Sequence, residues 1–171
     1  VHNKISSHTN FALDEIREKI KNSLSQVESP DNQEKGLAIA FCIINKVSKK
    51  LYYSGARVPL LLVRQEDSKT EPILEIFEPD SQLIGVNTEN QFVEKVVQLR
   101  ENDSFYIFAN DILQLEDKNR QELTEKQLQE TILANSHKSM NEQGKNIETV
   151  ISELQGNNGG ADDILAFGVR I

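Results

Sequence analysis

The feature that most constrains the fold is a succession of six strand-like segments between residues 37 and 108, with no helical pattern between them. Each segment is short, and is either continuously apolar or alternates apolar with polar residues, as strands do. The segments are Leu37–Ile44, Leu51–Tyr53, Leu60–Val63, Ile73–Phe77, Phe92–Leu99 and Phe105–Phe108. Consecutive strands of this kind exclude an alternating β-α parallel sheet and predict a layered α+β domain.

Helical patterns flank this strand region, and the chain ends on a further strand-like segment. Because Leu37–Ile44 is apolar throughout, we predict that this first strand is buried on both faces. The helical patterns and the last strand cover Asn10–Val27, the residues that follow a capping-box pattern at Thr124 and Gln127, Asn141–Gln155, and Ile164–Ile171. The expected order is therefore one helix, six strands, two helices and one strand.

Composition narrows the classes of function and location. The length of 171 residues predicts one domain over residues 1–171, with the polar residues 1–10 flexible. The 19 Lys and Arg against 27 Asp and Glu give a charge of −8, which argues against nucleic acid as a partner. There is no apolar run of about 18 residues, so we expect no membrane insertion. The polar start and the single cysteine lead us to expect a cytoplasmic location.

The histidines and the cysteine do not form a familiar catalytic pattern. His2, His8 and His137 are far apart and lie in polar surroundings, so we interpret them as surface residues. Cys42 lies within an apolar strand, where a cysteine usually acts as a small apolar residue. We therefore assign no catalytic residue among these four side chains.

Two acidic clusters at predicted strand ends remain as candidates for chemistry. Asp162 and Asp163 follow a glycine-rich turn and precede the last strand, where two carboxylates could hold a hard divalent cation. Asn110 and Asp111 follow the strand Phe105–Phe108. Because Asn and Asp also favour turns for conformational reasons, both clusters could equally be ordinary turns.

Five segments in order resemble a SpoIIE-type serine phosphatase domain, of the metal-dependent protein phosphatase superfamily related to protein phosphatase 2C. They match the family's buried strand, its Ala-Gly-His-x-Pro hairpin, its Pro-Leu-Gly turn, its Gly-Asp-strand-Thr-Asp-Gly motif and its Asp-Asp-x-Thr motif. In that order the segments are Leu37–Ile44, Leu51–Arg64, Leu83–Val86, Asn102–Asp111 and Gly160–Ile164.

The resemblance implies a metal site, at positions where this sequence partly departs from the family. Asp162 matches a metal-binding Asp of the family, and Asp163 is its acidic neighbour and a weaker candidate ligand. At the metal-binding Asp of Thr-Asp-Gly this chain has Asn110, a neutral and poorer ligand for Mg²⁺ or Mn²⁺. Arg57 replaces the family's His, and Leu165 its Thr.

The resemblance also implies a β-sandwich of two sheets flanked by helices, here without its N-terminal strands. Nothing in Val1–Gly36 resembles the Gly-Asp and Asp-x-x-Gly-His-Gly segments that supply further metal-binding acids in the family. We therefore expect little phosphatase activity from this chain. An unpaired strand edge would also favour a homodimer.

The resemblance leaves two hypotheses on function, and the residues by themselves a third. The chain could belong to a bacterial partner-switching phosphatase that needs Mn or Mg and acts on a phosphoprotein regulator such as an anti-sigma-factor antagonist. It could instead be a catalytically inactive phosphatase-like domain that acts by protein–protein interaction. Asp162 and Asp163 favour the first hypothesis, and Asn110 favours the second. An unrelated α+β binding module is the third.

Overall fold

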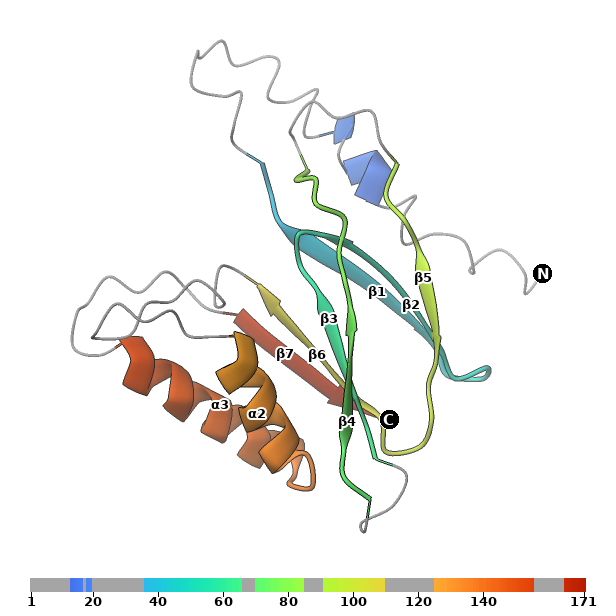
Figure 1. The fold of residues 1–171 in the computed structure, drawn as a ribbon. Helices are drawn as coiled ribbons and strands as arrows, with labels where there is room; N and C mark the ends of the chain where they lie inside the picture. Colours follow the sequence, from blue (N-terminus) through green and yellow to red (C-terminus); the bar gives the residue numbers. More distant parts are fainter. Residues whose placement is uncertain are drawn as a thin grey trace. The chain divides into compact units, whose positions relative to one another are not determined.

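The computed structural model describes residues 13–16, 18–19, 36–65, 70–84, 91–109, 125–155 and 165–171. The chain divides into two compact units, each built from two separate stretches of sequence (Figure 1). Unit one comprises Val1–Leu60 and Phe77–Leu99, and unit two comprises Leu61–Ile76 and Arg100–Ile171. The chain thus passes from one unit to the other after Leu60, after Ile76 and after Leu99.

Unit one contains a three-stranded antiparallel sheet in the order β1-β2-β5, with β1 Ile39–Asn45, β2 Lys50–Ala56 and β5 Lys95–Gln98. The β1–β2 hairpin turns through residues 46–49, as the polar sequence predicts. The Asn45 carboxamide oxygen accepts hydrogen bonds from the backbone N–H groups of Val47 and Ser48, at 3.1 and 3.0 Å. These bonds hold the turn in the manner typical of Asn.

The core of unit one joins the N-terminal helical segment to the sheet. Residues 13–16 and 18–19 are helical, which confirms that part of the predicted helix; its other residues lie outside the described ranges. The buried side chains are Leu13, Ala56, Ile84 and Phe92, with Ile16, Ile39 and Phe41 packed against them. Ile39 and Ala56 are Cα partners at one end of the β1–β2 hairpin, so the helical segment packs at that end.

The prediction that the first strand is buried on both faces was wrong. Residues Ile39–Ile44 of β1 are each only half-buried, and Leu37 is 50% exposed. The physical reason is position, because β1 is the outer strand of its sheet and pairs only with β2 among the described strands. A continuous apolar run indicates a strand, but it does not distinguish an outer strand from a central one.

Unit two contains a four-stranded sheet in the order β4-β3-β6-β7. Its strands are β3 Leu60–Arg64, β4 Ile73–Phe77, β6 Ser104–Ala109 and β7 Leu165–Arg170. Strands β6 and β7 are antiparallel, and their register pairs Ser104 with Arg170 at one end and Ala109 with Leu165 at the other.

Helices α2 Glu125–Asn135 and α3 Met140–Gln155 lie side by side against one face of this sheet (Figure 1). Alternate residues of β3 and β6 face the helices, as the two-residue period of a strand requires. The resulting core comprises Leu61, Val63, Tyr106, Phe108, Leu128, Ile132, Ile147 and Ile151. This packing of apolar helix stripes on a sheet explains why these modest helices are stable.

The start of α3 shows a capping box that the sequence reading missed. The Ser139 hydroxyl accepts from the Glu142 backbone N–H at 3.3 Å, and the Glu142 carboxylate accepts from the Ser139 N–H at 3.1 Å. Hydrogen bonds from Ser139 lower the pKa of Glu142. The capping box predicted at Thr124 falls outside the described residues, although α2 begins one residue later.

The predicted order of elements is confirmed for the described part of the chain. The strand predicted at Phe92–Leu99 is shorter, since only Lys95–Gln98 pairs with β2. Phe92 and Leu99 are nevertheless 2% exposed each, so both end positions are buried without being in a strand. Within these ranges no helix is long and apolar enough to cross a membrane.

Candidate functional site

The predicted metal-binding positions attach to strand ends that the structure brings together. Asn110 and Asp111, and also Asp162 and Asp163, lie outside the described residues, so their roles remain predictions. Ala109, which precedes Asn110 in sequence, is the Cα partner of Leu165, two residues after Asp163. The β6–β7 register therefore pairs the two strand ends next to which these segments stand in the sequence.

The described residues do not themselves supply a metal site. Within those ranges, no three His, Cys, Asp or Glu side chains come together as possible ligands of one ion. The donor set expected for Mn²⁺ or Mg²⁺ comprises the predicted ligands Asp162, Asp163 and Asn110. Two carboxylates and an amide oxygen are hard donors of the kind these cations take.

At the opposite end of β6, Asp103 stabilises the turn that precedes the strand. Asp103 is 2% exposed, and its Oδ2 accepts a hydrogen bond from the Arg100 N–H at 2.8 Å. The same oxygen lies 4.0 Å from Nε of Arg64, which also forms an ion pair with Glu75 at 3.0 Å. Asn102 adopts φ 68°, in the left-handed region that Asn tolerates where the family motif has Gly. Asp103 therefore fixes the start of β6.

The turn between β2 and β3, which matches the family's Ala-Gly-His-x-Pro segment, is closely packed. A Cβ on Gly55 would lie 2.2 Å from Tyr53 Oη and 2.4 Å from the Val58 carbonyl oxygen. Tyr53 Oη donates a hydrogen bond of 2.5 Å to that carbonyl, and burial raises the pKa of Tyr53 above its usual range. Only glycine fits at position 55, because the space for a side chain is already filled.

The same turn holds Arg57, which replaces the family's His, at the surface. Arg57 has φ 57°, its N–H donates to the Asp80 carbonyl at 2.9 Å, and its Nε donates to the Ser81 carbonyl at 2.8 Å. Asp80 in turn accepts from the Val93 N–H at 2.9 Å. These bonds fix the backbone and the base of the guanidinium group while the residue remains exposed.

Two of the four side chains to which the sequence assigns no catalytic role, Cys42 and His137, lie among the described residues. Burial raises the pKa of the Cys42 thiol to about 12, so it stays protonated near neutral pH. A protonated thiol is a poor nucleophile, which agrees with the reading of Cys42 as a small apolar residue. His137 is exposed, as predicted, while His2 and His8 lie outside the described residues.

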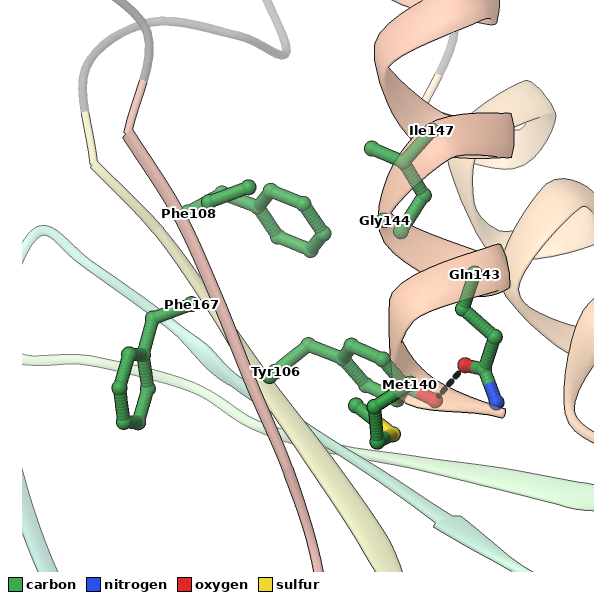
Figure 2. A pocket seen from close by; sticks show the side chains of 9 residues that line it. Tyr106, Phe108, Met140, Gln143, Gly144, Ile147 and Phe167 are labelled. Carbon is green, nitrogen blue, oxygen red and sulfur yellow. Dashed lines mark hydrogen bonds between the residues drawn. The ribbon is translucent and has the colours of Figure 1, made fainter. Parts of the chain in front are cut away.

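Unit two also contains a hollow that the sequence reading did not identify. It lies between α3 and strands β6 and β7, and has a volume of about 190 Å³ (Figure 2). Aromatic rings of Tyr106 and Phe108 form part of its lining, and a Cβ on Gly144 would meet nothing within 4 Å, so the hollow is open on the helix side. Ala166 and Gly168 also line it, but a Cβ on Gly168 would lie 2.7 Å from Met140 Cε. A glycine inside a helix, opposite two alternating small strand residues, was the available sequence signal.

The hollow has one polar end. Tyr106 Oη donates a 2.5 Å hydrogen bond to Gln143 Oε1, and both residues are 2% exposed or less (Figure 2). The Gln143 amide nitrogen donates to the Ser136 and Lys138 carbonyls, at 3.2 and 2.9 Å. Because these polar groups bond to one another and to the backbone, the remaining lining suits apolar groups.

Comparison with known proteins identifies the family. Residues 4–171 match the family described as Stage II sporulation protein E (SpoIIE). Among curated proteins, no sequence matches the chain significantly.

Two solved structures share the fold. The SiaA-PP2C domain of Pseudomonas aeruginosa is 16% identical, with a TM-score of 0.76 over 93% of this chain and 59% of that one. The phosphatase domain of the cell fate determinant SpoIIE from Bacillus subtilis is 18% identical, with a TM-score of 0.55 over 100% of this chain and 74% of that one. Two antiparallel sheets with flanking helices, as predicted, match this fold. The chain therefore belongs to the SpoIIE family and shares the fold of these two phosphatase domains.

Proposed function

We propose that the chain acts as a cytoplasmic signalling domain on a bacterial protein that carries phosphoserine or phosphothreonine. The expected partner is a phosphoprotein regulator such as an anti-sigma-factor antagonist. Family membership supports the phosphatase type of the domain. The chain spans 59% of the SiaA-PP2C domain, so activity, substrate and partner are all part of the proposal.

The observation that carries the proposal is the register of β6 and β7. Pairing of Ala109 with Leu165 joins the chain ends that continue into Asn110 and into Asp162–Asp163. An antiparallel pair holds facing Cα atoms about 4.5–5.5 Å apart. Segments that leave such a pair can contribute ligands to one ion, as the sequence predicted for Asp162, Asp163 and Asn110.

The proposed cofactor is Mn²⁺ or Mg²⁺, held first of all by Asp162. When bound, such a cation neutralises phosphoryl oxygens and lowers the pKa of a bound water, as phosphate-ester hydrolysis requires. The chain's own contribution is to present two carboxylates and one amide oxygen from paired strand ends. Because Asn110 is neutral where the family has a carboxylate, we expect weak cation binding and little hydrolysis.

A phosphoserine peptide in millimolar Mn²⁺ tests this proposal through phosphate release. We expect wild-type turnover to be no higher than that of Asp162→Ala. We expect Asn110→Asp to release phosphate faster than wild type, since it adds the family's carboxylate. Rapid wild-type turnover that Asp162→Ala abolishes would disprove the low activity, and an inert Asn110→Asp variant would count against the assigned ligands.

A second candidate function is binding of a protein partner without chemistry. The observation that favours it is Asn110 itself, since an amide at a ligand position is typical of a degenerate site. Equal affinity for the phosphorylated and unphosphorylated forms of an anti-sigma-factor antagonist, with no hydrolysis in any variant, would support this function. Preference for the phosphorylated form would support the phosphatase-type function instead.

A further inference from the structure

The β1–β2 turn carries a cluster of lysines in a chain that is acidic overall. Lys46, Lys49 and Lys50 fall within five residues, and all three are exposed. The chain as a whole has a charge of −8. The turn lies at one end of the three-stranded sheet of unit one (Figure 1). It is therefore a local basic surface on an acidic protein.

These lysines are not neutralised by neighbouring acids within the part of the chain that the structure describes. None of the three forms an ion pair there. The strand residues that lie next to the turn carry no charge either; they are Ile44, Asn45, Leu51, Val97 and Gln98. The positive charge of the turn is thus left for contacts with solvent or with another molecule.

Another lysine of the same sheet shows a different use. The Lys95 ammonium group donates a hydrogen bond to the Glu78 carbonyl, so this lysine contributes to the fold of unit one. No side chain of the turn lysines donates to a described residue. Burial of three ammonium groups without partners would be costly, unlike burial of an apolar strand edge. The turn is therefore a surface that the protein keeps in contact with water.

Hydrogen bonds from two sides stabilise the backbone of the turn. Besides the bonds that the Asn45 carboxamide accepts, the Gln98 side-chain amide donates to the carbonyls of Ser48 and Lys49, at 3.0 and 3.1 Å. The Leu99 N–H donates to the Lys49 carbonyl at 2.8 Å. A turn that is already ordered loses little conformational entropy when it binds a partner.

Val47 places an apolar side chain among the lysines, and it is 97% exposed. A single exposed valine is ordinary on a protein surface. Beside three lysines, however, it gives the turn an apolar contact as well as cationic ones. A ligand that matches the turn therefore has an apolar group with anionic groups on either side.

We propose that the β1–β2 turn binds an acidic segment of a partner protein, in which carboxylates flank an apolar residue. The carboxylates contact Lys46, Lys49 and Lys50, and the apolar residue packs on Val47. The site needs neither a cation nor a phosphate group, so it goes beyond the proposed function. It also belongs to unit one, whereas the predicted cation ligands adjoin strands of unit two.

Charge also distinguishes between classes of partner. At physiological ionic strength, electrostatic interactions between exposed charges fade over about 8 Å. A short segment at the turn therefore responds mainly to the three lysines. A membrane surface or a nucleic acid presents anionic groups to a much larger part of the chain, whose charge of −8 repels them. An acidic protein segment accordingly fits the turn better than either.

The probe is a fluorescein-labelled peptide in which glutamates flank a central leucine, followed by fluorescence anisotropy in EDTA. We expect saturable binding that weakens by about tenfold between low and physiological ionic strength, because salt screens the ion pairs. A peptide with glutamines in place of the glutamates should not bind. Equal binding of both peptides would overturn the proposal. EDTA keeps the result independent of the predicted cation site.

Two charge-reversal variants with the same total charge locate the binding. Lys46→Glu/Lys50→Glu places two carboxylates in the turn, and we expect binding weaker by about tenfold or more. Lys126→Glu/Lys145→Glu changes two exposed lysines of α2 and α3 and is the matched control, which should bind within about twofold of wild type. Equal weakening in the two variants would overturn the proposal, because net charge alone would then explain the binding.

Val47→Ser tests the apolar contact without a change of charge, and we expect it to weaken binding by about threefold. Wild-type affinity in this variant would overturn the apolar part of the proposal. Thermal melts by circular dichroism establish that each variant is folded. All the changed residues are exposed, so we expect wild-type melting; if one turn variant does not fold, the other decides.

Two further results would overturn the choice of partner. The first is cosedimentation of wild type, but not of Lys46→Glu/Lys50→Glu, with vesicles of phosphatidylserine and phosphatidylcholine at physiological ionic strength. The second is a wild-type dimer in analytical sedimentation that the same variant converts to a monomer, because a second copy would then occupy the turn. We expect no vesicle binding and no such dimer.

Discussion

Gly55, near the end of β2, and Gly144, in α3, lie in opposite surroundings. A Cβ on Gly55 would lie 2.4 Å from a backbone carbonyl oxygen, whereas a Cβ on Gly144 would have nothing within 4 Å. The first glycine is required because its surroundings are full. The second leaves a hollow beside an apolar strand edge, although alanine would form a more stable helix there.

The two glycines thus lie in different surroundings, one in a closely packed part of the structure and the other beside open space. Around Gly55, Tyr53, Arg57 and Asp80 form hydrogen bonds within unit one, and these bonds stabilise the turn. Around Gly144, the polar side chains of Tyr106 and Gln143 bond to each other, and Gln143 also bonds to the backbone. We infer that the residues around Gly55 have a structural role, whereas the hollow beside Gly144 is open.

The largest expected effect is that of Gly55→Ala. The added methyl group must displace the Val58 carbonyl or the Tyr53 ring, and such overpacking costs about 3 kcal/mol. Urea denaturation should show this loss in the free energy of unfolding. A loss below about 1 kcal/mol, no more than a typical point mutation costs, would show that the turn relaxes easily.

Tyr53→Phe should have the next largest effect. It removes the 2.5 Å hydrogen bond to the buried Val58 carbonyl, which costs about 1–2 kcal/mol. Tyr52→Phe on the same strand is the control and should leave the urea midpoint nearly unchanged, since Tyr52 is only half-buried. Equal effects of the two substitutions would contradict the special role of Tyr53.

Gly144→Ala should raise stability, in contrast to Gly55→Ala. Open space accepts the methyl group, and alanine improves helix stability by about 0.5–1 kcal/mol. The urea midpoint should therefore rise. A lower midpoint would mean that the hollow closes around Gly144 and that the comparison fails.

Burial of the Tyr53 hydroxyl should cause a smaller effect, a loss of stability at alkaline pH. Burial raises the pKa of Tyr53 above its ordinary value of 10, so the unfolded chain loses this proton first. The associated stability is complete below pH 10 and is lost as the pH rises above it. Cys42 acts in the same direction, from pH 9 to about 12.

The measurement compares how steeply the free energy of unfolding falls with pH in two proteins. Wild type and Tyr53→Phe are unfolded in urea from pH 9 upward, and the variant should lose stability less steeply. Parallel slopes would mean that Tyr53 ionises as easily in the folded protein as in the unfolded chain.

Sequence periodicity predicted the order of the elements because strands and helices differ in period. It could not predict that β1 is an outer strand, since burial depends on which strands pair. It also did not identify the Ser139–Glu142 capping box, which begins in the short connection before α3 and ends in the first turn of that helix. These differences arise from tertiary contacts rather than from local preference.

The candidate site divides in the same way. The family motifs led to Asp162, Asp163 and Asn110, and the β6–β7 register adds that their segments attach to paired strand ends. No motif pointed to the hollow, because it depends on how α3 packs beside β6 and β7 and not on a local pattern of residues. Small residues such as Gly144 and Ala166 give little signal in a single sequence.

Calorimetric titration with Mn²⁺ tests most directly whether the segments after β6 and before β7 form one cation site. Three proteins are compared: wild type, Asn110→Asp and Asp162→Ala. We predict weak binding by wild type, binding tighter by about tenfold in Asn110→Asp because of the added carboxylate, and none in Asp162→Ala. The same affinity in all three proteins would contradict the account.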